Sequence, residues 1–167
     1  MNVEERSALI SRNWPEAVTP HVKFSAIIQR LNSLLVEHSK MAIKGQHLTV
    51  SEFDVLAALR SCPEGAALAP TALYDALLIS SGGLTKILKS LENQKLIARS
   101  TSASDARQRP VMLTESGKLR IEAAMADMVA FTRTLLQDGF SDDEACDAVV
   151  EKLKDVVHVL EEKKRPD

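Results

Sequence analysis

Residues 77–100 of the sequence read LLISSGGLTKILKSLENQKLIARS. The apolar residues from Leu84 to Leu91 recur at steps of three and four, which predicts an amphipathic helix that begins near the capping residue Ser80. Only two residues separate this helix from a shorter apolar pattern at 70–78, where a proline fits the first helical turn. Two helices joined so tightly must cross at a steep angle, as they do in a helix-turn-helix.

The pattern after this helix is that of a β-hairpin. Residues 96–100 and 111–113 are two short runs that favour β-structure, and a stretch of small and polar residues joins them. Pro110 is acceptable at the start of a short or edge strand, because proline lacks an amide to donate. We therefore expect a two-stranded wing directly after the helix-turn-helix.

Two further helices are predicted ahead of residue 70. Apolar residues between Val22 and Ala42 recur with helical spacing, which predicts one long helix that ends at Lys44-Gly45. The next helix opens with a capping box formed by Thr49 and Glu52, flanked by a hydrophobic staple of Leu48 and Phe53. This second helix should stop before Pro63.

Two helices are also predicted after the hairpin. Thr114 is positioned to cap a helix that runs to about Leu136. The sequence Ser141-Asp142-Asp143-Glu144 is read as a second capping box that opens the last helix. The apolar stripe of this last helix consists of Ala145, Val149, Leu153, Val156 and Leu160.

The fold class that follows is mainly α with a small β-hairpin wing, a winged helix-turn-helix flanked by N- and C-terminal dimerisation helices. We expect residues 1–47 to form an N-terminal arm and a long helix that contributes to dimerisation. Residues 48–114 should form the DNA-binding lobe, and residues 115–167 the C-terminal dimerisation helices. The flanking helices carry more amphipathic surface than a small lobe can bury, so a homodimer is expected.

Composition limits the classes of function. The chain has 167 residues, of which 45% are apolar, which suits one well-buried domain. No apolar run approaches the roughly 18 residues that span a bilayer, and the charged N-terminus lacks the apolar stretch of a signal peptide. We therefore expect a cytoplasmic protein with no membrane partner. No Gly-rich phosphate loop or nucleophile motif indicates an enzyme, and no cofactor or metal is predicted.

Charge is distributed unevenly along the chain. The formal net charge is −2, yet Ser80 to Arg120 contains eight basic and three acidic residues, while the rest contains 13 basic and 20 acidic residues. One face of the molecule can therefore attract phosphates while the remainder repels them. This polarity favours binding to double-stranded DNA.

The expected DNA contacts lie on the helix of residues 80–93 and on the wing. Its apolar stripe packs inward, which leaves glycine, hydroxyl and lysine residues on the side that would enter a major groove. Gly82 and Gly83 each cost about 1 kcal/mol of helix propensity relative to alanine, so a purely structural helix would gain from losing them. The wing arginines can reach a narrow minor groove. The expected contacts are Ser80, Ser81, Gly82, Thr85, Lys86, Lys89, Asp105, Arg107 and Arg109.

Several of these motifs together resemble the multiple-antibiotic-resistance regulator (MarR) family. The similar segments are Leu48-Thr49 with Glu52-Phe53, then residues 80–85, 96–99 and 105–107, and finally Val111 to Gly117. The resemblance implies a homodimer whose first, fifth and sixth helices interlock, bound to a pseudo-palindromic operator. It also implies a recognition helix at residues 80–93 and a wing arginine at Arg107 that Asp105 orients.

The same resemblance implies a small-molecule inducer, because members of the family commonly release DNA when a small aromatic or phenolic anion binds. A urate-responsive subgroup is similar in having a tryptophan and an aspartate at the positions of Trp14 and Asp54, which makes these the candidate ligand-binding residues. Its arginine in the recognition helix is replaced here by Ile87. Alternatively, Trp14 anchors the N-terminal arm on the partner subunit, and Asp54 is an exposed or ion-paired residue of a first helical turn.

Three other functions stay open at this point. Winged helices also serve as protein-interaction modules without DNA binding, although such modules typically lose the wing cations. Cys62 and Cys146 have no CxxC spacing, and Cys62 follows a helix whose dipole disfavours a thiolate, which argues against a redox sensor. The four histidines form no HxH or HxxxH pair, so a metal-sensing site would have to be assembled from distant segments.

Overall fold

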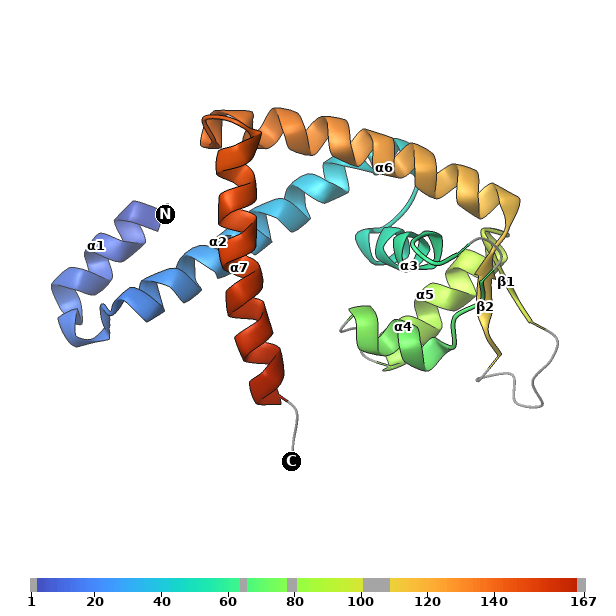
Figure 1. The fold of residues 1–167 in the computed structure, drawn as a ribbon, viewed down its shortest axis with the longest axis horizontal. Coiled ribbons are helices and arrows are strands. Elements are labelled where there is room, and N and C mark those ends of the chain that lie inside the picture. Colours follow the sequence, from blue (N-terminus) through green and yellow to red (C-terminus); the bar gives the residue numbers. More distant parts are fainter. Residues whose placement is uncertain (1–2, 64–65, 78–80, 101–108, 165–167) are drawn as a thin grey trace. The chain divides into compact units, whose positions relative to one another are not determined.

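The computed structural model describes residues 3–63, 66–77, 81–100 and 109–164. Over these residues the chain is mainly helical and contains one two-stranded antiparallel hairpin, as predicted (Figure 1). The chain forms two units, residues 1–128 and 129–167. In the described part of the chain, no helix has both the length and the apolar composition that a membrane crossing needs.

The first unit begins with two helices, α1 (Val3–Asn13) and α2 (Pro20–Ala42), which are separated by the 3-10 turn η1 (Pro15–Ala17). α2 is the long helix that the apolar periodicity predicts, and its start is capped by Thr19, whose hydroxyl oxygen accepts from the amide of Val22. α1 is an addition to the predicted elements. It has acidic residues in its first turn and an arginine in its last, which complement the helix dipole.

The helix α3 (Val50–Arg60) follows the 3-10 turn η2 (Lys44–Gln46). Its predicted capping box is confirmed. The amide of Glu52 donates to Thr49 Oγ1 over 3.2 Å, and the amide of Thr49 donates to Glu52 Oε2 over 2.9 Å. Leu48 and Phe53, the predicted staple residues, are buried in one apolar cluster. The helix ends before the proline that is expected to stop it.

The helix-turn-helix pair consists of α4 (Pro70–Leu77) and α5 (Ser81–Asn93). α5 ends in a Schellman motif, in which the amide of Lys95 donates to the carbonyl of Glu92 and the amide of Leu96 donates to that of Leu91. Lys95 adopts the left-handed backbone conformation that this motif requires, with φ of 58°. The motif reverses the chain directly into the first strand.

The wing stem pairs β1 (Ile97–Arg99) with β2 (Val111–Leu113) in the register Ile97 opposite Leu113. Val111 also exchanges two backbone hydrogen bonds with Leu68, which lies just ahead of α4. The hairpin therefore follows α5 along the chain and also pairs with the segment that precedes α4. Its base has a fixed position relative to both helices.

The helix α6 (Glu115–Leu136) starts directly after β2 and continues from the first unit into the second. Thr114 caps it as predicted, since its hydroxyl oxygen accepts from the amide of Gly117 at 3.0 Å. The same hydroxyl donates to the carbonyl of Lys95 at 2.7 Å. Arg120 donates to the carbonyl oxygen of Gln46 at 2.7 Å, which ties α6 to the connection between α2 and α3.

In the second unit the 3-10 turn η3 (Gln137–Gly139) precedes α7 (Asp143–Lys164). The predicted capping box of Ser141 and Glu144 is wrong. The amide of Ala145 donates to Asp142 Oδ1 at 2.8 Å, and the hydroxyl of Ser141 donates to Asp142 Oδ2 at 3.0 Å. Aspartate caps a helix as well as serine does, and Asp142 stands directly before the first helical residue. These hydrogen bonds hold the pKa of Asp142 below its usual value.

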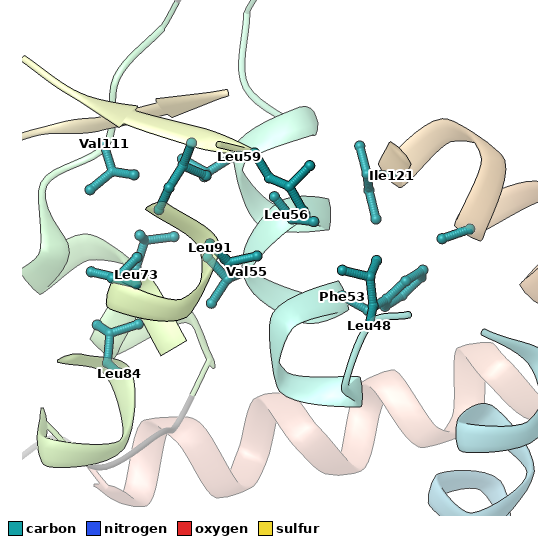
Figure 2. Packing of buried hydrophobic residues seen from close by; sticks show 14 of the residues in the cluster. Leu48, Phe53, Val55, Leu56, Leu59, Leu73, Leu84, Leu91, Val111 and Ile121 are labelled. Carbon is teal, nitrogen blue, oxygen red and sulfur yellow. The ribbon is translucent and has the colours of Figure 1, made fainter. Parts of the chain in front are cut away.

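The core of the first unit is one apolar cluster built from α3, α4, α5, the hairpin and α6, as Figure 2 shows. Val55 and Leu56 of α3 lie at its centre and are inaccessible to solvent, as are Leu73 of α4 and Leu91 of α5. Because α3 contributes to this cluster from several sides of its axis, it forms the scaffold on which α5 is mounted.

Candidate nucleic-acid interface

The helix α5 has two faces of opposite character. Leu84, Leu88 and Leu91 are no more than 4% exposed and pack into the core, and Ile87 is half-buried against it. α5 contacts α3, α4 and β1 through this face. The other face is exposed and includes Gly82, Thr85, Lys86 and Lys89. α5 therefore presents small, hydroxyl and cationic groups outward in the way that the sequence predicts.

Gly82 near the start of α5 is not required by packing. A Cβ added at this position would have no atom of the chain within 4 Å, and the backbone there does not adopt positive φ. Helix propensity alone would favour alanine by about 1 kcal/mol. The fold therefore supplies no reason for the glycine, whereas the close approach of another molecule's backbone to the helix would supply one.

The structure describes only some of the other predicted DNA contacts. Ser80, Asp105 and Arg107 lie outside the described residues. Ser81 is the first residue of α5, and Arg109 is half-buried immediately before Pro110 and β2. The structure thus locates both ends of the wing loop, and the amide of Ser100 donates to the carbonyl of Pro110 at 2.9 Å to close its base.

An ion pair connects α5 to the wing. Arg99 in β1 donates through Nε to Glu92 Oε1 near the end of α5 at 2.8 Å. Their side chains are 21% and 33% exposed, so solvent screens this pair less than it screens a surface pair. The contact fixes the helix and the hairpin base in one arrangement.

A buried carboxylate, that of Glu52, also contacts the end of α5. Glu52 is 6% exposed, and its Oε2 serves the capping box of α3. Its Oε1 accepts hydrogen bonds from the hydroxyl of Ser90 at 2.6 Å and from Nε2 of Gln94 at 2.9 Å. Burial raises the pKa of Glu52, but the hydrogen bonds from Ser90, Thr49 and Gln94 outweigh it and hold the pKa below its usual value. The carboxylate is therefore charged at neutral pH.

Sequence reasoning predicts Glu52 as a cap and misses its contact with α5. Ser90 and Gln94 are one helical turn apart, and their only signal in the sequence is their polarity beside an apolar stripe. That spacing indicates that a polar partner is present without identifying it. The partner lies 38 residues away from Ser90 along the chain.

The two candidate ligand-binding residues lie in different surroundings. Trp14 stands between α1 and η1 and is 65% exposed. Both of its predicted roles need a second molecule to cover the ring. Asp54 lies in the second turn of α3 and is half-buried, which corrects the alternative that it is a first-turn residue. Burial raises the pKa of Asp54.

Cys62 borders a hollow of about 240 Å³ between the end of α3, β2 and the start of α6. Its thiol is half-buried and donates to the carbonyl of Ala58 at 3.5 Å. Cys146 in α7 is also a free, half-buried thiol. Among the described residues, no group of three or more His, Cys, Asp or Glu side chains is arranged to hold a metal ion.

Comparison with known proteins identifies the family. A family model described as the MarR family matches residues 48–108, which span α3 to the wing loop. The HTH-type transcriptional regulator PecS of Dickeya dadantii is 30% identical over 113 residues, which cover 67% of this chain and 68% of PecS. The chain belongs to the MarR family of transcriptional regulators.

Solved structures share the fold of this MarR-family regulator. CouR of Rhodococcus jostii RHA1 bound to p-coumaroyl-CoA superimposes with a TM-score of 0.69 at 15% identity, over 86% of this chain and 95% of CouR. The S. aureus MepR–DNA complex gives a TM-score of 0.66 at 21% identity, over 81% of this chain and 97% of MepR. The winged helix predicted from the sequence is thus confirmed, and the family and the fold are those of transcriptional regulators.

Proposed function

We propose that this regulator is a homodimeric repressor that binds a pseudo-palindromic stretch of double-stranded DNA. In each subunit α5 enters the major groove with Gly82, Thr85, Lys86 and Lys89 facing the DNA. The observation that carries this proposal is the outward face of α5, where the open position at Gly82 precedes a hydroxyl and two lysines. MepR, which has the same fold, has been solved in complex with DNA.

Dimerisation is supported by apolar residues that a single chain leaves in water. On α2 the side chains of Phe24, Ile27 and Leu31 are 43%, 46% and 38% exposed, and they follow one stripe of the helix. On α7 the side chains of Val157 and Leu160 are 50% and 61% exposed. Exposed apolar stripes of this kind mark association sites, so we assign residues 1–47 and 115–167 to the dimer interface and residues 48–114 to the DNA-binding lobe.

The wing completes the interface in each half-site. Arg107 reaches into the minor groove, and Asp105 orients its guanidinium or the loop backbone. Removing Arg107 costs about 1 to 3 kcal/mol per half-site, most of all over A·T-rich sequence where the groove is narrow. Asp105→Asn separates two explanations, because simple electrostatics predicts tighter DNA binding and a positioning role predicts weaker binding.

The regulator releases DNA when a small aromatic or phenolic anion binds near Trp14 and Asp54. CouR, which has the same fold, has been solved with p-coumaroyl-CoA. Trp14 is the single tryptophan of the chain, so its fluorescence reports directly on a ligand that covers the ring. Titration with p-coumarate should quench this fluorescence and weaken duplex binding in parallel. Quenching without release of DNA would contradict the inducer role.

The DNA-binding proposal is tested by Lys86→Ala and Lys89→Ala. If these lysines contact phosphate, each variant should weaken specific and nonspecific duplex binding and lower the salt dependence by about one unit of slope per lost contact per half-site. A lysine that reads a base should instead lose selectivity at one base pair. Affinity is measured by fluorescence anisotropy with labelled duplexes at several salt concentrations.

The matched control is Lys152→Ala on α7, where the lysine is 85% exposed and lies outside the DNA-binding lobe. It removes the same charge from the dimer, and its salt slope should equal that of the wild type. Sedimentation checks that all variants remain dimers. Unchanged binding in both α5 variants would remove this helix from the interface and favour a protein-interaction module instead.

A further inference from the structure

Glu52 is the one buried charged residue of the described core, and its hydrogen bonds divide between two helices. Oε2 accepts from the amide and the hydroxyl of Thr49 at 2.9 and 3.0 Å, within the capping box of α3. Oε1 accepts from the hydroxyl of Ser90, in the last turn of α5, at 2.6 Å and from the side-chain amide of Gln94, directly after α5, at 2.9 Å.

A capping box requires only the contact of the glutamate with the N-cap residue, which here is that of Oε2 with Thr49. Its glutamate satisfies the amide of the N-cap residue and otherwise remains at the surface of its own helix. Here the second oxygen accepts from one side chain of α5 and from one directly after it, and those two side chains also contact each other, since Gln94 Nε2 lies 3.3 Å from Ser90 Oγ. The start of α3 and the end of α5 are thus joined through one carboxylate.

We propose that Glu52 is a positioning residue that fixes the rotation of α5 about its axis and its displacement along α3. The leucines of α5 hold it against the core, but apolar contacts are not directional and tolerate small rotations. Hydrogen bonds to a carboxylate constrain both distance and angle. Glu52 and the ion pair of Arg99 with Glu92 hold α5 against two different elements, α3 and β1.

The inference rests on the proposed function, because it assigns Glu52 to sequence discrimination by α5. Contacts with bases require a defined helix orientation, whereas lysine contacts with phosphates tolerate a displaced helix. Loss of the link should therefore weaken binding to the preferred sequence more than binding to unrelated DNA. A purely structural role would lower both affinities equally, since it only reduces the fraction of folded protein.

The test uses the double variant Ser90→Ala with Gln94→Ala, which leaves the capping box of α3 intact. The specific probe is the duplex that the wild-type protein enriches from a randomised pool, and the nonspecific probe is a scrambled duplex of equal length and composition. We expect the ratio of the two affinities to fall by about tenfold, the equivalent of one well-made base contact, while nonspecific affinity stays within about twofold.

Three further variants define the origin of the effect. Ser39→Ala is the matched control, because Ser39 is likewise half-buried in a helix and its hydroxyl donates only to the carbonyl of Leu35. Its affinity ratio should equal that of the wild type. Ser90→Thr keeps the hydroxyl and should restore most of the ratio in a Gln94→Ala background. Glu52→Gln keeps an acceptor for the amide of Thr49 and should give an intermediate ratio.

The outcomes of this experiment distinguish failure of the positioning role from failure of the proposed function. An unchanged ratio in the double variant, or an equal fall of both affinities together with a lower folded fraction, overturns the positioning role and leaves the proposed function standing. If the wild-type protein enriches no sequence from the pool, the proposed function fails, and the positioning role fails with it.

Discussion

Replacing Gly117 with alanine should destabilise the protein, although alanine is the better helix former. Gly117 lies in the first turn of α6, where the helix passes the end of the Schellman motif. A Cβ at this position would lie 1.9 Å from the carbonyl oxygen of Leu96, 2.9 Å from its carbonyl carbon and 3.2 Å from Leu113 Cδ2. The carbonyl cannot swing aside freely, because it accepts the amide of Thr114 at 3.1 Å.

The expected loss of stability follows from the movement that the added methyl group would force on its neighbours. Separating the new methyl group from the oxygen requires a shift of about 1 Å in either α6 or the chain at Leu96. This shift weakens the hydrogen bond from Thr114, which contributes about 1 kcal/mol. It also displaces Leu96, which is 3% exposed in the core, at an overpacking cost of about 1 to 3 kcal/mol. Alanine returns about 1 kcal/mol of helix propensity, so a net loss of about 1 to 3 kcal/mol is expected.

Urea unfolding followed by far-UV circular dichroism measures this loss. All samples need the same protein concentration, because the stability of a dimer depends on it. Gly45→Ala is the control, since no atom lies within 4 Å of a Cβ there and the backbone does not adopt positive φ. It should leave stability unchanged or raise it by up to about 1 kcal/mol. Equal stability of Gly117→Ala and the wild type would refute the steric argument.

Three other predictions follow from single observations. Gly82→Ala should leave the unfolding midpoint unchanged or higher, because the position is open, yet weaken duplex binding; equal duplex affinity would remove the functional reason for this glycine. Lys95→Gly should stabilise the protein by up to about 1 kcal/mol in urea, because glycine adopts positive φ without strain, and a lower midpoint would contradict this. The lowered pKa of Glu52 adds stability that is present above pH 4.5, its unfolded value, and is lost as the pH falls through the lower folded value. Urea midpoints of Glu52→Gln should therefore depend less on pH in this range than those of the wild type.

Local signals in the sequence were sufficient for most of the elements. The capping box of Thr49 and Glu52, the cap at Thr114 and the proline that begins α4 all act within one helical turn, so their partners lie within about four residues. The same reasoning failed at Ser141, where two adjacent residues are both good caps and the choice depends on where the chain turns after η3. The helix α1 was not predicted because most of its residues are polar or charged.

In the candidate interface, too, some features are predictable from the local sequence and others are not. The outward residues Gly82, Thr85, Lys86 and Lys89 are predictable because the leucines of α5 fix which side of the helix faces inward. The wing residues Asp105 and Arg107 stay predictions from the sequence, since they lie outside the described residues. The contacts of α5 with Glu52 and Arg99 could not be predicted in this way, because they join residues on separate elements.

The sequence by itself determined the helices from α2 to α7, the caps at Thr49 and Thr114 and the face of α5 that points outward, because each depends on interactions between residues close together along the chain. Only the tertiary structure decided that Oε1 of Glu52 meets Ser90 and Gln94, and that Gly117 is required beside Leu96. These contacts depend on the distance between segments that lie 21 to 42 residues apart. No local periodicity encodes such a distance, because it is set by how the core residues of several elements pack together.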